Sequence, residues 1–124
     1  MNNLLTIGIY RRSGRQASLV FRKGNQMIYR ITAITDAPVL VNALRVYEHN
    51  LYKNLADPKF VVEVLCPRNR QRVLEISLLK GMASCCVFEK AGSAMDLCFK
   101  WRGSEMDLVN SMRQFTVMAF MSRY

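Results

Sequence analysis

Several features are missing from this 124-residue chain, and these absences reduce the number of functions that it can have. No Asp or Glu precedes Asp36. No apolar run approaches the roughly 18 residues that a helix needs to cross a bilayer, so we expect no membrane span. The chain has no C-x-x-C pair, no phosphate loop, no dinucleotide fingerprint and no nucleophile elbow. We therefore expect that the protein binds neither a metal nor a cofactor and that it is not an enzyme.

The charge that is present is strongly positive. Eighteen Lys and Arg residues stand against nine Asp and Glu, which gives a formal net charge of +9. An excess of this size indicates an anionic partner rather than a particular fold. The cations in the acid-free N-terminal part are Arg11, Arg12, Arg15, Arg22, Lys23 and Arg30, and a second group after Pro67 comprises Arg68, Arg70 and Arg72.

The remaining composition is that of one globular domain spanning residues 1–124. Apolar residues make up 51% of the chain and charged residues 22%, which allows a sizeable core. The four cysteines, an even number, would permit two disulfides. Because the chain has core-forming residues and no secretory signal, we expect reduced thiols in an intracellular compartment instead.

Residue patterns predict the secondary structure. Alternating β-branched and aromatic residues predict three strands, at 4–11, 16–23 and 26–33, with turns at Ser13-Gly14 and Gly24-Asn25. Helical spacing of leucines predicts a helix over 37–55, capped by Asp36 and ended by Asp57-Pro58. Further strands are predicted at 59–66, 72–80, 83–90 and 95–102. Ser104 and Asp107 form an approximate capping box that opens a second helix.

This order predicts an α+β fold of the type βββα-ββββα, with antiparallel meanders each followed by a helix. The two halves, about 1–57 and 58–124, have a similar plan and are expected to pack as one domain. The order resembles that of PUR-repeat and whirly-type proteins, which bind single-stranded nucleic acid and are built from units of four strands and a helix. The resemblance covers the whole chain but rests on element order alone, and the first half has three strands.

Turn positions predict which residues share a face of the N-terminal meander. With two-residue turns, Ile7 opposes Val20, Ile9 opposes Ser18 and Arg22 opposes Met27. The predicted core face then holds Leu5, Ile7, Ile9, Val20, Met27, Tyr29 and Ile31. The predicted opposite face holds Thr6, Gly8, Tyr10, Ala17, Leu19, Phe21, Lys23, Ile28, Arg30 and Thr32. Rings among cations suit single-stranded nucleic acid, because Tyr10 and Phe21 can stack on bases. The alternative is that this face is buried against the second half or another subunit.

The basic turns are separate candidates for phosphate contacts. Arg11, Arg12 and Arg15 crowd one hairpin tip without a neighbouring acid, which favours an anion between them. The alternative is a solvated tip that keeps a sheet edge soluble. The loop with Arg68, Arg70 and Arg72 is of the same type and would extend the phosphate track.

Catalytic arrangements are few. His49, the single histidine, lies within the first predicted helix and is interpreted as structural. Cys86 is predicted to oppose Phe99 in the core, which argues against a zinc site. Glu89 and Asp96 would oppose one another across the Gly92-Ser93 turn and are the one pair that a metal-dependent nuclease would use. This pair alone makes a nuclease a minor alternative.

The second helix is apolar nearly all the way round at 115–121, so it must be covered on every side. We therefore expect a homo-oligomer, at least a dimer. The function predicted from the sequence is non-enzymatic binding of nucleic acid, either RNA or single-stranded DNA. The alternative is a protein-interaction or assembly module, such as a small complex subunit or a viral accessory factor.

Overall fold

The computed structural model describes residues 4–11, 17–55, 57–66 and 71–121, and of residues 11 and 116–121 it describes the backbone only. The elements are β1 (Leu5–Arg11), β2 (Ala17–Lys23), β3 (Gln26–Ile34), α1 (Ala37–Tyr52), β4 (Lys59–Val64), β5 (Arg72–Leu79), β6 (Met82–Ala91), β7 (Ala94–Ser104) and α2 (Glu105–Met121). The predicted α+β fold with the order βββα-ββββα is confirmed.

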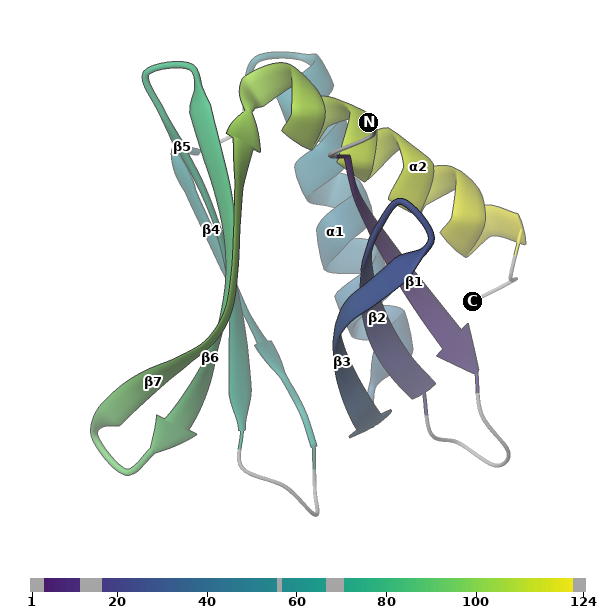
Figure 1. Cartoon of the computed structure of the whole chain (residues 1–124). Helices are drawn as coiled ribbons and strands as arrows, with labels where there is room; N and C mark the ends of the chain where they lie inside the picture. Colours follow the sequence, from purple (N-terminus) through teal and green to yellow (C-terminus); the bar gives the residue numbers. More distant parts are fainter. Residues whose placement is uncertain (1–3, 12–16, 56, 67–70, 122–124) are drawn as a thin grey trace.

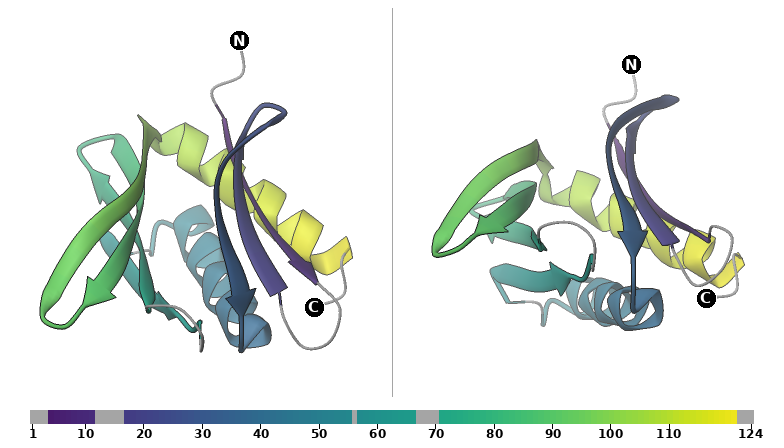
Figure 2. Two further views of the ribbon diagram at one scale, coloured as in Figure 1. Left: turned by 60° about the horizontal axis from the view of Figure 1, so that its bottom comes forward. Right: turned by 90° about the horizontal axis from the view of Figure 1, so that it is seen from below.

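The strands form two antiparallel sheets. The first sheet has the order β1-β2-β3 and the second sheet the order β4-β5-β6-β7. Figure 1 shows the second sheet on the left and the first sheet on the right, with α1 behind them, and α2 packs against β1 and α1. Figure 2 shows that the sheets diverge, so that each keeps one face turned outward.

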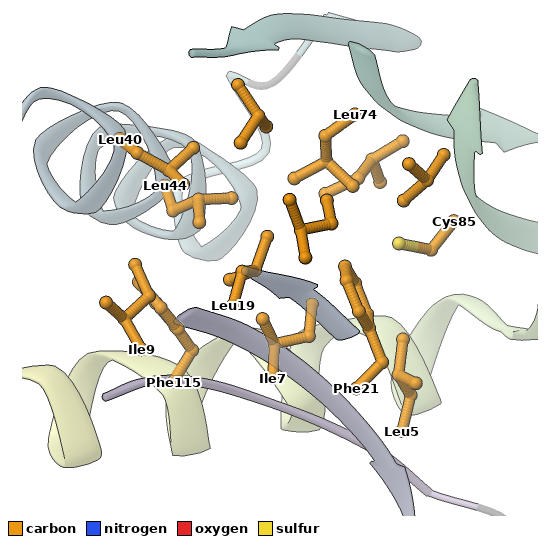
Figure 3. Close-up of a cluster of buried hydrophobic side chains, with 14 of the residues drawn as sticks. Leu5, Ile7, Ile9, Leu19, Phe21, Leu40, Leu44, Leu74, Cys85 and Phe115 are labelled. Atoms are coloured by element: carbon orange, nitrogen blue, oxygen red, sulfur yellow. The ribbon is translucent and has the colours of Figure 1, made fainter. Parts of the chain in front are cut away.

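The core lies where the inner faces of both sheets meet the helices. Figure 3 shows Ile7 and Phe21 of the first sheet, Leu74 and Cys85 of the second sheet, and Leu44 of α1 pointing into a common cluster. Aromatic contacts join the two sheets. The ring centroid of Phe99 lies 4.9 Å from that of Phe21 and 5.4 Å from that of Tyr29. These contacts place both halves of the chain in one core.

The predicted register of β1 and β2 is wrong by one residue. Ile7 opposes Phe21, not Val20, and Ile9 opposes Leu19, not Ser18. Arg11 pairs with Ala17, a register that a two-residue turn at Ser13-Gly14 does not give. The consequence is an exchange of faces. The residues that move from the predicted opposite face to the core are Ala17, Leu19 and Phe21. Val20 moves to the opposite face, where it is still buried.

A bulge between β2 and β3 explains why one predicted pair survives. Arg22 opposes Met27 as predicted, but the register shifts between Phe21 and Arg22, so that Phe21 opposes Tyr29. An extra residue in one strand moves every later side chain to the other face. The prediction for Tyr29 as an inner residue therefore holds, and that for Ile28 as an outer residue does not, because Ile28 packs against the core.

The helix ends agree in part with prediction. Asp36 is the N-cap residue of α1, but its side chain makes no capping hydrogen bond, because its backbone is left-handed with φ 61°. The helix ends at Tyr52, so Leu55 lies beyond it and is exposed. The capping box of α2 is confirmed: the Asp107 N–H donates to Ser104 Oγ and the Ser104 N–H donates to Asp107 Oδ2, both at 3.1 Å.

In the second sheet, Cys86 opposes Lys100 and not the predicted Phe99, because the register shifts between Val87 and Phe88. Cys86 is nevertheless buried, and the four cysteines are free thiols. In the part of the chain described above, no helix combines the length and the apolar character needed to cross a membrane.

Candidate nucleic-acid interface

The outer face of the first sheet turns away from the core. Successive side chains of a strand point to opposite faces. Leu5 and Ile7 belong to the core cluster, so their neighbours in β1 lie on the opposite face of the sheet. We define the outer face by the residues that oppose one another on that side: Thr6, Gly8, Tyr10, Ser18, Val20, Arg22 and Arg30. It brings together three of the predicted site residues, Tyr10, Arg22 and Arg30, of which the predicted register had placed Arg22 on the core face. Of the other members, Gly8, Ser18 and Val20 are buried.

Tyr10 lies flat along β1, over Gly8. A Cβ atom on Gly8 would lie 2.9 Å from Cε2 and 3.0 Å from the hydroxyl oxygen of Tyr10. The ring therefore occupies the space that any other residue at position 8 would fill. Gly8 is buried beneath it, while Tyr10 remains 39% exposed. The strand at Gly8 thus supports the ring from below.

Arg22 places a cation beside this ring. Its guanidinium carbon lies 6.0 Å from the ring centroid of Tyr10, at the outer limit of a cation–π contact. Arg22 opposes Thr6 in the sheet, and Thr6 is the next residue before Gly8 on the same face of β1. A flat ring with a guanidinium beside it is the combination that single-stranded nucleic acid uses, with bases stacked on rings and phosphates near cations.

No acidic residue lies in the first sheet to neutralise these cations, because the sequence has none before Asp36. Within the described ranges, the ion pairs are Lys59 with Glu75 at 3.7 Å and Lys90 with Glu63 at 2.7 Å, and both lie on the second sheet. Arg22 and Arg30 make no ion pair with any described residue. The first sheet thus carries cations and no acid, whereas the second sheet carries side chains of both signs.

The other predicted site residues divide into three groups. Arg30 and Lys23 are exposed on β3 and β2. Arg11 ends β1, with only its backbone described. The remaining predicted phosphate contacts lie outside the described residues: Arg12, Arg15, Arg68 and Arg70. The phosphate track predicted for the two basic turns therefore stays a prediction.

Phe21 does not lie where the stacking prediction needs it. Its side chain is fully buried, and its ring contacts those of Tyr29 at 5.9 Å and Phe99 at 4.9 Å. A ring in the core offers no face to a base. The one-residue error in register produced this misplacement, so Tyr10 alone remains as the stacking ring of the outer face.

Arg72 lies between the two sheets rather than on a basic loop. Its Nε donates a hydrogen bond to the Tyr29 hydroxyl at 3.2 Å. Burial alone would lower the pKa of Arg72, but its hydrogen bond and electrostatic interaction with Tyr29 outweigh this and raise it. Burial raises the pKa of Tyr29 more than Arg72 lowers it, so the hydroxyl stays protonated. Arg72 therefore links the halves of the chain and is left out of the interface.

The residues that would support a nuclease are only partly assembled. Glu89 opposes Asp96, as predicted. Within the described residues, however, no three His, Cys, Asp or Glu side chains cluster as a metal ion would require. His49 is exposed on α1. The Glu89 carboxylate instead accepts a hydrogen bond from Cys98 Sγ at 3.8 Å.

Comparison of the chain with protein-family models, with curated proteins and with solved structures found no match. Arguments about function therefore rest on the residues themselves.

Proposed function

We propose that this protein binds single-stranded nucleic acid, RNA or DNA, through the outer face of the first sheet. The observation that carries the proposal is the flat ring of Tyr10 over Gly8, with Arg22 beside it on a sheet without acids. A base would stack on Tyr10, and Arg22 and Arg30 would contact neighbouring phosphates. The turn arginines Arg11, Arg12 and Arg15 would extend the phosphate contacts beyond the end of β1.

The proposal predicts two different mutational signatures. Stacking contributes about 1 to 3 kcal/mol per base, so Tyr10→Ala should weaken binding by about 5-fold to 150-fold with little change in salt dependence. Each phosphate contact releases counterion, so Arg22→Ala or Arg30→Ala should flatten the slope of log affinity against log salt by about 0.7. Fluorescence anisotropy with labelled single-stranded RNA and DNA over a salt series measures both quantities.

The helices supply a matched control. Arg113 lies over the ring of Tyr52 at 5.2 Å, and Tyr52 is 65% exposed. Tyr52→Ala and Arg113→Ala thus remove the same groups and the same charge at a contact between α1 and α2. The proposal expects both to bind almost normally. Absence of any complex at low salt, or equal losses at the control pair, would contradict it.

A protein partner is the second candidate, as expected for an assembly module. The observation that favours it is the exposed apolar hairpin of β6 and β7, where Met95 is 45% and Leu97 is 53% exposed. A homo-oligomer formed through α2 also remains a proposal, because the side chains of 116–121 lie outside the described part. Loss of a protein partner on Leu97→Ser, with nucleic-acid binding unchanged, would favour this second candidate.

A further inference from the structure

Strand β4 has an edge whose backbone groups point away from its own sheet. The carbonyl of Pro58 accepts a hydrogen bond from the Leu78 N–H at 2.7 Å. Because hydrogen-bonded and non-hydrogen-bonded residues alternate in an antiparallel pair, even-numbered residues of β4 face β5. The odd-numbered residues Lys59, Val61 and Glu63 therefore direct their N–H and C=O groups to the free edge. No backbone hydrogen bond from another described element reaches them.

The free edge has a definite end. At Leu65, just past β4, the carbonyl accepts a hydrogen bond from the Thr35 N–H at 2.9 Å, on the side away from β5. Beyond this point the chain leading into α1 covers the edge. Figure 2 shows β4 at the margin of its sheet, beside α1. The uncovered part thus corresponds to the strand itself, Lys59–Val64.

Apolar side chains that the rest of the chain leaves exposed lie along this edge. Val61 is 53% exposed on the outer face of β4. On the adjoining helix α1, Val39 and Val46 are 59% and 51% exposed, two helical turns apart on one side. A hollow between α1 and β4 is lined by Val46 and Phe60, among others. An unpaired edge beside an apolar helix stripe is a surface that pairing with another strand would cover.

The sequence of β4 is complementary to itself in one antiparallel register. When Val61 opposes Val61 of a second copy, Lys59 opposes Glu63 and Phe60 opposes Val62. Opposed residues share a face. Burial alternates along β4 with Lys59, Val61 and Glu63 exposed, so the charged pair falls on the outer face and Phe60 with Val62 on the inner face. If the two-fold axis lay at residue 60 or 62, Lys59 would oppose an apolar residue. If it lay at residue 63, the Glu63 carboxylates of the two copies would oppose each other.

We propose that a second copy of this chain binds here, so that β4 pairs with β4 of its partner across a two-fold axis at Val61. The two four-stranded sheets become one continuous sheet, and the inner face of the added strand extends over the α1 stripe. Local charge permits this contact despite the net charge of +9. Lys59 and Glu63 already have partners of opposite sign, Glu75 and Lys90, so the edge is neutral.

Charge reversal separates contacts between chains from contacts within one chain. In Lys59→Glu, carboxylates at positions 59 and 63 face each other across the axis, and in Glu63→Lys two ammonium groups do so. Each single variant should therefore shift the protein toward monomer. The double variant restores both pairs between chains, while its pairs with Glu75 and Lys90 stay repulsive. Recovery of the dimer in the double variant therefore reports the contact between copies. Light scattering or sedimentation measures the mass, against 14.3 kDa for one chain.

Crosslinking tests the register independently. Opposed Cα atoms of a hydrogen-bonded antiparallel pair lie about 5.5 Å apart, within the range of a disulfide. In a Cys98→Ser background, which removes the exposed native thiol, Val61→Cys should give a covalent dimer on oxidation. Glu63→Cys should not, because the two copies of residue 63 lie four residues apart along the paired strands.

Each outcome decides the proposal. A dimer that single reversals weaken and the double variant restores, with crosslinking at 61 and not at 63, supports it. A chain that is monomeric at every concentration tested overturns it. A dimer that is indifferent to the reversals, or that crosslinks at 63 in preference to 61, places the interface elsewhere and equally overturns it. Circular dichroism of each variant confirms that the fold is intact.

Discussion

Addition of a single methyl group at Gly8 should weaken nucleic-acid binding without removing any binding atom. The Cβ of Gly8→Ala would lie 2.9 Å from Cε2 of Tyr10, closer than atoms in contact allow. The ring belongs to a partly exposed side chain and can rotate away. Tyr10 then stands off the sheet, and its surface is no longer held flat for a base.

Gly8→Ala should leave the stability of the fold unchanged or raise it, and should lower the affinity for nucleic acid. Gly8 has no positive φ, and replacing glycine by alanine at a compatible position stabilises a protein by about 0.4 to 1 kcal/mol. We therefore expect a Tm that is unchanged or higher by about 1 to 3 °C. Affinity should fall toward that of Tyr10→Ala, by about 5-fold to 150-fold if the stacking contribution is lost.

Thermal unfolding and anisotropy on the same preparations provide the assay. The double variant Gly8→Ala with Tyr10→Ala should bind no more weakly than Tyr10→Ala alone, since both changes act through one ring. Gly103→Ala is an instructive contrast, because its Cβ would overlap the buried ring of Trp101, which cannot move away. That variant should be destabilised by about 1 to 3 kcal/mol. Unchanged affinity of Gly8→Ala, with Tyr10→Ala weak, would refute the requirement for a flat ring.

Two further predictions concern stability. The Tyr47 hydroxyl is buried without a hydrogen-bond partner, and burial raises the pKa of Tyr47 from 10.0 to about 12. Unfolded tyrosine ionises in this window while the folded side chain stays neutral, so stability should fall from pH 10 to pH 12. Tyr47→Phe should remove this part of the loss and gain about 1 kcal/mol at neutral pH; equal alkaline slopes in urea titrations would contradict this. Ser104→Ala should cost about 1 kcal/mol, and an additive loss with Asp107→Ala would argue against their reciprocal bonds.

Local patterns were sufficient to predict the order and nearly all bounds of the elements. Alternation and turn glycines mark each strand, and the reciprocal hydrogen bonds of Ser104 and Asp107 follow from their spacing alone. Asp36 shows the limit of such rules. Its position at the start of α1 was predicted, yet its left-handed backbone turns the carboxylate away from the cap. Propensity identifies the residue but not the dihedral angles that decide its contacts.

The faces of the first sheet were harder to predict, because register depends on features that composition does not encode. Arg11 pairs with Ala17, which differs from the register of a two-residue turn at Ser13-Gly14, and a bulge follows Phe21. Either feature exchanges inner and outer residues. A usable signal was nevertheless present: glycine two residues before tyrosine in a strand provides room for a flat ring. Gly8 and Tyr10 have this spacing.

Charge and topology together give the two proposals a joint consequence. The first sheet carries arginines and no acid, whereas β4, the edge of the second sheet, is neutral. Pairing through β4 would therefore leave both outer faces free and create a bivalent binder. Strands long enough to reach both faces should then bind more tightly than short ones, through effective concentration rather than new contacts.

Val61→Pro provides the test of this consequence. Its N–H points to the free edge, so the substitution removes a bond between copies, leaves the β4–β5 ladder intact and alters no charge. Short oligonucleotides should bind the variant and the unchanged protein equally, while long ones should lose their advantage on the variant. If the length dependence survives in a monomeric Val61→Pro protein, the extra affinity arises within one chain, and the two surfaces act independently.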